Sequence, residues 1–272
     1  MKRPDLKKGL RRGIYVIPTS FTILNLFFGF RSIVNSTLAI EQIAKGNIDL
    51  SIPLFEHACW ALFFAAVFDT FDGLAARQLG ATSEFGKEYD SLADVVTFGA
   101  APAVLLYAWG LRILGPLGAG IAFLFLVAVS LRLARFNVMT GKTDYRYFVG
   151  LPSPAGALTI ASIVNYAPAP VNDLRFSYVM LVVTIFVSFS MVSPIRYRSQ
   201  KGLNLQKERS LVYFLVFALV LAIALKWPKE FFFMFAMLYL LSGQFTRLWS
   251  IAFPPRHIDE DAAPAEPVEH AP

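Results

Sequence analysis

Four aspartates stand close together in an otherwise apolar stretch of this sequence, at Asp69, Asp72, Asp90 and Asp94. The first two are three positions apart and the last two are four apart, so on helices each pair would lie on one face, one turn apart. Two carboxylates separated by about 4 Å repel each other by roughly 4 kcal/mol at an effective dielectric constant near 20. Convergence of all four on one cleft therefore requires a positive charge among them.

The ligand chemistry of this stretch favours a hard divalent cation. Neither His nor Cys occurs between Val67 and Val96, and ligand sets made only of oxygen suit Mg²⁺ or Mn²⁺ better than zinc, with Ca²⁺ as an alternative. Carboxylates at bilayer depth are costly and mark functional sites. A structural alternative is that the aspartates pair with Arg77 and Lys87 at a helix end, because the spacing alone fits both interpretations.

Small residues and an arginine lie among the aspartates. Gly73 follows Asp72 directly, and Gly86 precedes Asp90, so neither places a side chain where a ligand would approach the cleft. Arg77 lies about two helical turns after Asp69 and can bind phosphate oxygens. Cations, small residues and an arginine together predict a diphosphate site, and two cations about 4 Å apart are a common arrangement for in-line displacement at phosphorus.

The elements that must position these residues are membrane-spanning helices. Of the 272 residues, 56% are hydrophobic and 16% are charged, whereas a soluble domain has about 25% charged residues. Apolar runs of about 20 residues cross the hydrocarbon of a bilayer. They predict an all-α, polytopic transmembrane bundle of about eight spans, near residues 15–40, 53–79, 90–109, 116–138, 150–167, 176–194, 210–225 and 230–250.

The distribution of basic residues predicts that both termini are cytoplasmic. The segment Met1–Arg12 is rich in Lys and Arg, and every second connection after it is also basic, as expected of cytoplasmic loops. We divide the chain into a basic N-terminal segment (1–13), a transmembrane core (14–208), an additional C-terminal helix pair (209–252) and a disordered cytoplasmic tail (253–272). The net charge is +6, but the basic residues are distributed according to membrane sidedness and do not form one contiguous patch. We therefore expect no nucleic-acid partner.

The acidic stretch closely resembles the signature of the CDP-alcohol phosphotransferase family. That signature is D-x-x-D-G-x-x-A-R, then eight residues, then G-x-x-x-D-x-x-x-D, and the stretch from Asp69 to Asp94 matches every defining position. Motifs this long at fixed spacing are specific. The resemblance covers about Pro18 to Pro154, and it implies six core helices, whereas this chain is predicted to have eight spans. That departure leaves the role of the last helix pair open.

The resemblance implies a role for each residue of the motif. The family transfers a phosphatidyl or related group from a CDP-linked donor to an alcohol and releases CMP, at a site with two metal ions that faces the cytoplasm. The expected ligands of Mg²⁺ or Mn²⁺ are Asp69, Asp72, Asp90 and Asp94, and Asp94 is also the expected general base on the attacking hydroxyl. The residues expected to line the nucleotide and diphosphate are Gly73, Ala76, Arg77, Gly86, Thr22 and Asn25. The family also implies a homodimer.

Two further stretches favour L-serine as the acceptor alcohol. Residues 130–138 and 149–157, like residues 18–30, resemble those of the family members that use L-serine. A zwitterionic acceptor needs a cation for its carboxylate, so we expect the acceptor site to contain Arg132, Arg135, Asn137 and Ser153. Ordinary positive-inside arginines at a helix C-terminus would give the same pattern.

We therefore predict an enzyme of phospholipid biosynthesis in the bacterial inner membrane, with CDP-diacylglycerol and L-serine as substrates. Another acceptor, such as choline, inositol or glycerol 3-phosphate, is the nearest alternative. A divalent-cation transporter is a more distant alternative. Such a protein would have acidic residues distributed through several spans, whereas here they are clustered in one stretch.

Overall fold

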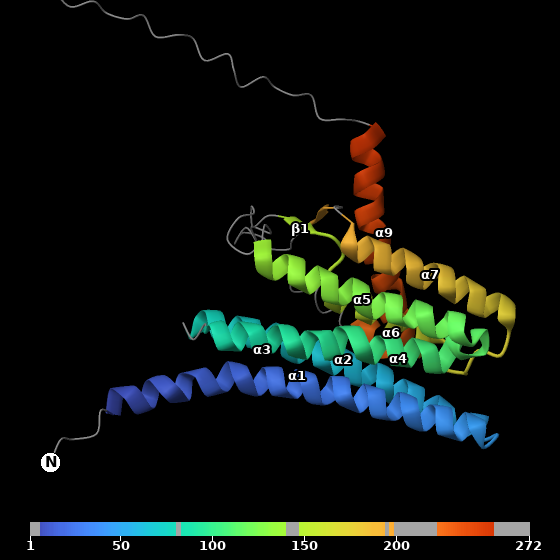
Figure 1. Ribbon diagram of the computed structural model, residues 1–272, viewed down its shortest axis with the longest axis horizontal. Helices are drawn as coiled ribbons and strands as arrows, with labels where there is room; N and C mark the ends of the chain where they lie inside the picture. The colour runs from blue at the N-terminus through green and yellow to red at the C-terminus, as the bar shows by residue number, and fades with distance from the viewer. Residues whose placement is uncertain (1–5, 80–82, 140–146, 194–195, 199–221, 253–272) are drawn as a thin grey trace, which may run out of the picture.

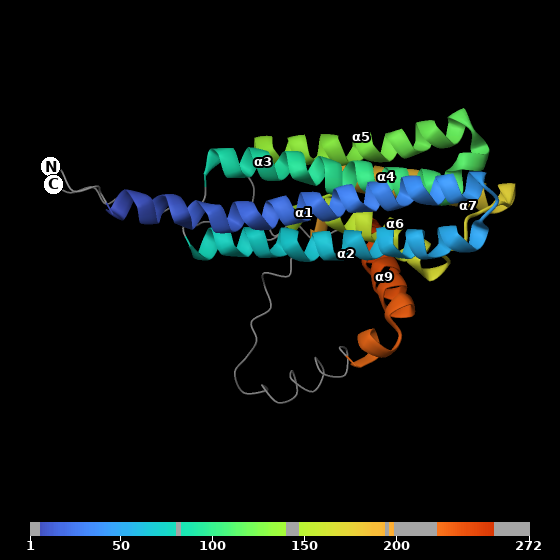
Figure 2. The ribbon, with the colours of Figure 1, turned by 90° about the horizontal axis from the view of Figure 1, so that it is seen from below.

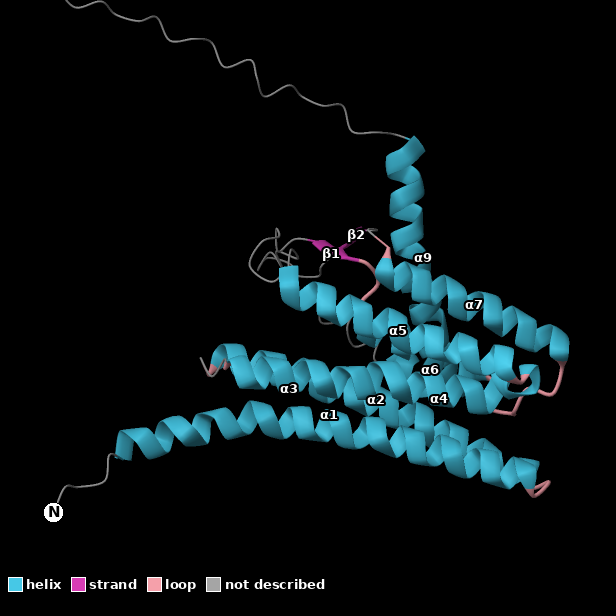
Figure 3. Cartoon of the chain, viewed as in Figure 1, coloured by secondary structure: helices cyan, strands magenta, loops and turns pink. Residues whose placement is uncertain are grey.

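The computed structural model describes residues 6–79, 83–139, 147–193, 196–198 and 222–252. These residues form a bundle of long helices with one small two-stranded sheet (Figures 1 and 3). The α-helices are α1 (Leu6–Ala44), α2 (Ile48–Gln78), α3 (Glu84–Asp94), α4 (Ala101–Leu106), α5 (Pro116–Met139), α6 (Ser153–Tyr166), α7 (Leu174–Val192) and α9 (Pro228–Ala252). The strands are β1 (Tyr147–Val149) and β2 (Arg196–Arg198), which pair antiparallel. The all-helical character predicted from the sequence is thus confirmed, apart from this short sheet.

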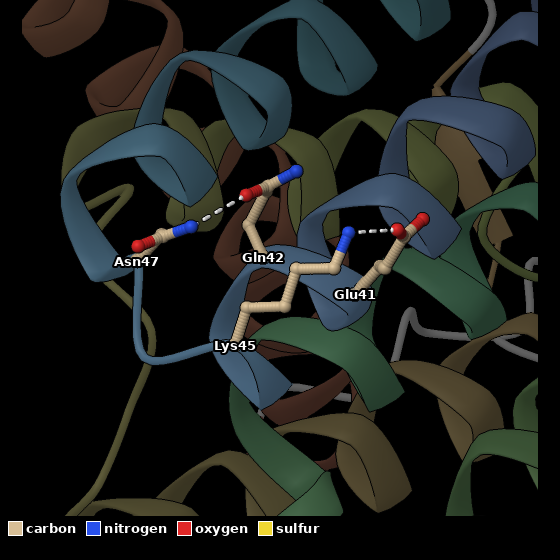
Figure 4. A network of polar contacts seen from close by, with 4 residues as sticks. All are labelled: Glu41, Gln42, Lys45 and Asn47. Carbon is tan, nitrogen blue, oxygen red and sulfur yellow. Dashed lines mark hydrogen bonds and ion pairs between the residues drawn. The ribbon is translucent and has the colours of Figure 1, made fainter.

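Helices α1 and α2 lie side by side along their length, as Figures 1 and 2 show. A tight turn joins them, in which Gly46 has a φ of 81°, a left-handed conformation that glycine adopts without steric cost. Figure 4 shows the polar contacts that fix this turn: Lys45 pairs with Glu41, and the Asn47 amide donates to the Gln42 side chain at 3.2 Å. Further along, the rings of Phe28 and Phe68 stack with centroids 5.4 Å apart.

The third span is one continuous helical rod with changes of pitch. After α3 it continues through a π-helical segment η1 (Val95–Ala100), α4, a second π-helical segment η2 (Tyr107–Leu111) and the 3₁₀ turn η3 (Arg112–Leu114). Each π segment inserts residues into the helical ladder, and such insertions are frequent at functional sites. The first begins directly after Asp94.

Five of the described helices are long and apolar enough to cross a membrane, over Pro18–Ala44, Ile48–Ala75, Glu84–Leu114, Pro116–Val138 and Leu174–Val192. The chain is therefore an integral membrane protein by the length and composition of its helices. The span predicted at 150–167 is instead the 14-residue α6, about 21 Å long and shorter than the roughly 30 Å of bilayer hydrocarbon. Most of the span predicted at 210–225 lies outside the described residues, so the count of eight stays a prediction.

The last helix, α9, runs across the bundle instead of along it (Figures 1 and 2). It packs on α6, and its residue Leu240 is buried in the core of the bundle. Near its start, Lys229 forms a salt bridge with Glu56 of α2. The membrane span predicted at 230–250 is thus a helix, but its direction differs from that of the other long helices.

The basic connections gather at one end of the bundle. In Figure 1 the start of α1, the α2–α3 connection and the sheet that follows α5 lie at the same end, and the connections with fewer basic residues lie at the other. This arrangement agrees with the alternation expected from the sequence.

A close contact between α1 and η1 generates the first prediction. A Cβ atom on Gly29 would lie 2.4 Å from Oγ1 and 2.8 Å from Cα of Thr97, so a side chain there must push the two helices apart. We expect Gly29→Ala to lower the thermal unfolding midpoint of the detergent-solubilised protein, since overpacking typically costs about 1–3 kcal/mol. Gly120→Ala is the matched control, because a Cβ on Gly120 of α5 meets nothing within 4 Å. Equal midpoints for the two variants would contradict the prediction.

Candidate active site

Three carboxylates converge between the end of α2 and the start of the third span. Asp69, Asp72 and Asp90 each offer an oxygen, and these oxygens all lie within 4.8 Å of one another. Asp72 is buried, with 5% of its surface exposed. Asp69 and Asp72 are three residues apart on α2, so they lie on one helix face. Helix α3 packs opposite this face and brings Asp90 to them.

Asp94 completes the group from one turn further along α3. Its carboxyl group lies within hydrogen-bonding range of that of Asp69. The carboxyl groups of Asp72 and Asp90 form a second such pair. Asp94 is buried, at 9% exposure. All four aspartates named by the motif therefore lie in one place, as the spacing of the sequence predicts.

Helix α1 supplies hydrogen-bond donors to two of these carboxylates. The Thr22 hydroxyl donates to Asp72 Oδ2 at 3.2 Å, and the Asn25 amide donates to Asp94 Oδ1 at 3.2 Å. Thr22 and Asn25 are one turn apart, which places both on the α1 face that meets the cluster. Their predicted role at the nucleotide is not tested by these contacts, which instead orient the aspartates.

The packing of α1 against η1, next to the acidic cluster, holds Asn25 in position. The Thr97 hydroxyl of η1 donates to the Asn25 backbone oxygen at 3.3 Å, next to the close approach of Gly29 and Thr97. In a π segment the backbone N–H groups bond five residues back instead of four, so the regular hydrogen-bond ladder is interrupted. Polar groups there are free to contact neighbouring helices. The segment after Asp94 thereby locks α3 against α1.

No salt bridge to the acidic cluster occurs within the described residues. Within the described ranges the salt bridges are Lys45–Glu41 and Lys229–Glu56, and neither includes the four aspartates. Lys87 is exposed, so its pairing with the cluster, one of the structural alternatives, is not observed. The side chain of Arg77 lies outside the described residues, and that pairing is not tested.

A divalent cation fits this cluster. Every ligand atom is a carboxylate oxygen, the donor type that hard cations prefer. Asp90 Oδ1 is buried and has no hydrogen-bond partner among the described residues, although buried polar atoms are normally paired. A cation bound between the carboxylates would give this oxygen the partner that it lacks.

The small residues of the motif lie on both sides of the α2–α3 connection. Gly73 and the backbones of Ala76 and Arg77 belong to the last turns of α2, and the side chains of the latter two are outside the described part of the chain. The Gly86 backbone N–H donates to Ser83 Oγ at 2.9 Å, which caps α3. The predicted contacts of these four residues with a nucleotide remain predictions.

Two of the predicted acceptor residues meet directly. Arg132 of α5 is buried, at 7% exposure, and its Nη1 donates to the buried Ser153 hydroxyl at 3.0 Å. Arg132 also interacts electrostatically with Asp94. A buried guanidinium is costly without partners, and its Nε has none among the described residues. The arginine therefore presents an unused donor beside the acidic cluster.

The loop before α6 holds Ser153 in this position. Gly150 has a φ of 84°, and a Cβ there would lie 2.2 Å from the Met191 backbone oxygen. The Leu151 N–H donates to the Ser190 backbone oxygen at 2.9 Å. Only glycine fits so close to the end of α7 with this backbone conformation, so the loop is fastened to α7 directly before Ser153.

Arg135 and Asn137 contact other parts of the protein, and their place in an acceptor site stays a prediction. Arg135 Nη1 donates to the Val192 backbone oxygen at 2.9 Å, at the C-terminal end of α7, where a cation also favours the helix dipole. Asn137 Nδ2 donates to Ser91 Oγ at 2.9 Å. Ser91 stands between Asp90 and Asp94, so this bond ties α5 to the acidic helix. Ser91 was not among the residues predicted to build the site, although its place inside the motif is a usable signal.

The helices and the cluster define an integral membrane protein with a buried acidic site at one end of its bundle. Residues 15–192, well over half of the chain, match the family described as CDP-alcohol phosphatidyltransferase. The chain therefore belongs to this family, and the resemblance found in the sequence is confirmed.

Several curated proteins are similar over most of the chain. The CDP-diacylglycerol–serine O-phosphatidyltransferase of Helicobacter pylori is 31% identical over 236 residues, which are 85% of this chain and 90% of that protein. The protein of the same name from Bacillus subtilis is 33% identical over 182 residues, 66% of this chain and 89% of that protein. Archaetidylserine synthase of Methanothermobacter thermautotrophicus is 33% identical over 196 residues, 69% of this chain and 72% of that protein.

The unpartnered oxygen of Asp90 generates the second prediction. We expect Asp90→Asn to weaken Mn²⁺ binding by about a hundredfold or more, since even residues outside the ligand shell cost 10- to 100-fold. Free Mn²⁺ measured by electron paramagnetic resonance during titration of the purified protein gives the affinity. Asp173→Asn is the matched control, because Asp173 caps α7 at the other end of the bundle and asparagine caps equally well. Unchanged Mn²⁺ affinity in Asp90→Asn would exclude the proposed ligand set.

Proposed function

We propose that this protein transfers the phosphatidyl group of CDP-diacylglycerol to the hydroxyl of L-serine, giving phosphatidylserine and CMP. The observation that carries the proposal is the buried Arg132–Ser153 pair beside the four-aspartate cluster of the family motif. The names of the similar proteins support the same acceptor, since those from Helicobacter pylori and Bacillus subtilis are called CDP-diacylglycerol–serine O-phosphatidyltransferases.

The four aspartates would hold two divalent ions, Mg²⁺ or Mn²⁺. Bound there, the ions would neutralise the diphosphate and the charge that develops at phosphorus during displacement. The chain's own contribution is to hold the carboxylates in place: Thr22 and Asn25 donate to Asp72 and Asp94, which leaves their remaining oxygens for the ions. Gly73, Ala76, Arg77 and Gly86 would line the nucleotide and diphosphate.

Asp94 is the proposed general base. The serine hydroxyl oxygen forms a bond to the phosphorus of the phosphatidyl group, the bond from that phosphorus to the CMP oxygen breaks, and the hydroxyl proton passes to an Asp94 oxygen. A base must lie within hydrogen-bond reach of the proton it removes. The contacts of Asp94 with the acidic cluster support this choice, because the reacting phosphorus would lie at the ions held there.

Arg132 is the proposed site of the serine carboxylate. Its buried Nε offers a donor, and a charged hydrogen bond to a carboxylate is about twice as strong as a neutral one. Ser153 fixes the guanidinium through the bond to Nη1. Arg135 and Asn137 would act on the same pocket indirectly, since the first binds the end of α7 and the second binds Ser91.

We place the site on the cytoplasmic side of a bacterial inner membrane. The acidic cluster lies at the end of the bundle that carries the basic connections, and that end faces the cytoplasm by the positive-inside rule. Water-soluble L-serine would enter from that side, while the acyl chains of the donor remain in the bilayer. A homodimer, expected of the family, remains part of the proposal.

The choice of acceptor is the third prediction. Purified protein with Mn²⁺ and CDP-diacylglycerol is expected to release CMP rapidly with L-serine and slowly with choline, inositol or glycerol 3-phosphate, because those three lack a carboxylate for Arg132. Chromatographic measurement of CMP for each alcohol gives the comparison. Turnover with glycerol 3-phosphate equal to or above that with L-serine would refute the assignment of the acceptor while leaving the family unchanged.

The role of Asp94 is the fourth prediction. Asp94→Asn keeps the shape of the side chain but removes its basicity, so we expect the rate of CMP release at saturating L-serine to fall by about 10²- to 10⁴-fold. The rate is compared with that of the Asp173→Asn control under the same conditions. An Asp94→Asn enzyme with nearly normal turnover would show that another group accepts the proton.

A further inference from the structure

The crosswise helix α9 lies outside the region matched by the family, which ends at residue 192. Its start is anchored on α2, the helix that carries the first two aspartates of the acidic cluster. Lys229 forms a salt bridge with Glu56 of α2. One turn later, the ring of Phe232 stacks on that of Phe63 of α2 with centroids 4.5 Å apart. An ion pair and an aromatic contact therefore fix this end of α9.

The second anchor of α9 is on α7. Gln244 lies about 22 Å further along the helix than Lys229, at 1.5 Å per residue, and its Nε2 donates to Ser190 Oγ at 2.9 Å. Ser190 is buried and Gln244 is half-buried, so the bond joins the two helices inside the bundle. Because α9 is held at both points, it connects α2 with the C-terminal end of α7.

Ser190 also holds the loop that presents Ser153. Its backbone oxygen accepts a hydrogen bond from the Leu151 N–H at 2.9 Å. Ser153 follows two positions later, and its hydroxyl accepts from Arg132 Nη1 at 3.0 Å. One residue thus binds α9 through its side chain and the acceptor-side loop through its backbone.

Helix α9 also contacts the elements on both sides of this loop. It packs on α6, which follows the loop, and on β2, whose partner β1 precedes the loop. In the sheet, Val149 pairs with Arg196, directly before the loop begins. The position of the loop therefore depends on α9 through three separate contacts, of which the Gln244–Ser190 bond is the polar one described here.

We propose that Gln244 is a positioning residue of the acceptor site. By holding Ser190 it keeps Ser153 within hydrogen-bond reach of Arg132, and the guanidinium stays oriented toward the carboxylate of the acceptor. The proposal deepens the proposed function and rests on it. It assigns the C-terminal helix, whose role the family resemblance leaves open, to the binding of the acceptor. Gln244 itself contacts no substrate in this proposal.

The test is the steady-state kinetics of Gln244→Met, which removes the amide and keeps the length of the side chain. Loss of one neutral hydrogen bond is expected to raise the KM for L-serine about three- to tenfold. The KM for CDP-diacylglycerol, the Mn²⁺ affinity and the rate at saturating L-serine should stay within about twofold, since the bonds from Thr22 and Asn25 to the aspartates are unchanged. An unchanged KM for L-serine would overturn the proposal.

Glu230→Met is the matched control. Glu230 is exposed on the first turn of α9, so this variant replaces a polar side chain of the same length by the same residue in the same helix. Its KM for L-serine should equal that of the wild type. A lowered unfolding midpoint in Gln244→Met together with a higher KM for both substrates would indicate a purely structural role and overturn the proposal.

Gln244→Asn provides a second variant in case Gln244→Met does not fold. It keeps the amide but is one methylene shorter, so the bond to Ser190 is lost while the polarity of the site is retained. The same rise in the KM for L-serine is expected, and a wild-type value would count against the proposal.

The double variant Ser190→Ala with Gln244→Met adds another readout. Ser190→Ala removes the hydroxyl but keeps the backbone oxygen that binds Leu151. If Gln244 acts through Ser190, the KM for L-serine in the double variant equals that in either single variant, because residues in contact are energetically coupled. Independent, multiplying effects would contradict this route.

Failure of this inference and failure of the proposed function give different results. Wild-type protein without L-serine turnover would refute the proposed function itself. Normal wild-type turnover with an unchanged KM for L-serine in the Gln244 variants would refute only the positioning role.

Discussion

The mutual repulsion of four clustered carboxylates is the constraint on which the rest of this structure depends. Asp72 and Asp94 are buried, and Asp69 and Asp90 are half-buried beside them, in an apolar bundle where each uncompensated charge is expensive. Hydrogen bonds from Thr22 and Asn25 offset part of this cost, and the remainder is left for bound cations. The protein thus tolerates an unfavourable arrangement that becomes favourable when a divalent ion binds.

Close helix packing keeps this arrangement from relaxing. Gly29 allows α1 to approach the π segment that follows Asp94, and Thr97 donates to the backbone of Asn25 across the same contact. Asn137 holds the acidic helix from the opposite side through Ser91. These contacts hold the aspartates together, so their oxygens are preorganised in a way that could hold a cation.

The proposed acceptor side is built from elements that are distant in the sequence. Arg132 comes from α5, and Ser153 comes from the start of the short α6. Helix α6 has only 14 residues, and α9 crosses the bundle in contact with it. The position of the Arg132–Ser153 pair therefore depends on how α5 and the loop before α6 are held at the end of α7.

The sequence by itself determined the membrane-spanning helices and the acidic motif. Spacing of three and four residues brings aspartates to one helix face whatever surrounds them, and runs such as 116–138 are apolar over a full bilayer thickness. Only the tertiary structure decided which groups face the motif. That Asn25 donates to Asp94, that Asn137 donates to Ser91, and that α9 crosses the bundle on α6 all depend on contacts between distant segments. Local periodicity carries no information about such contacts, because they are set by the packing of whole helices and by a change of pitch after Asp94.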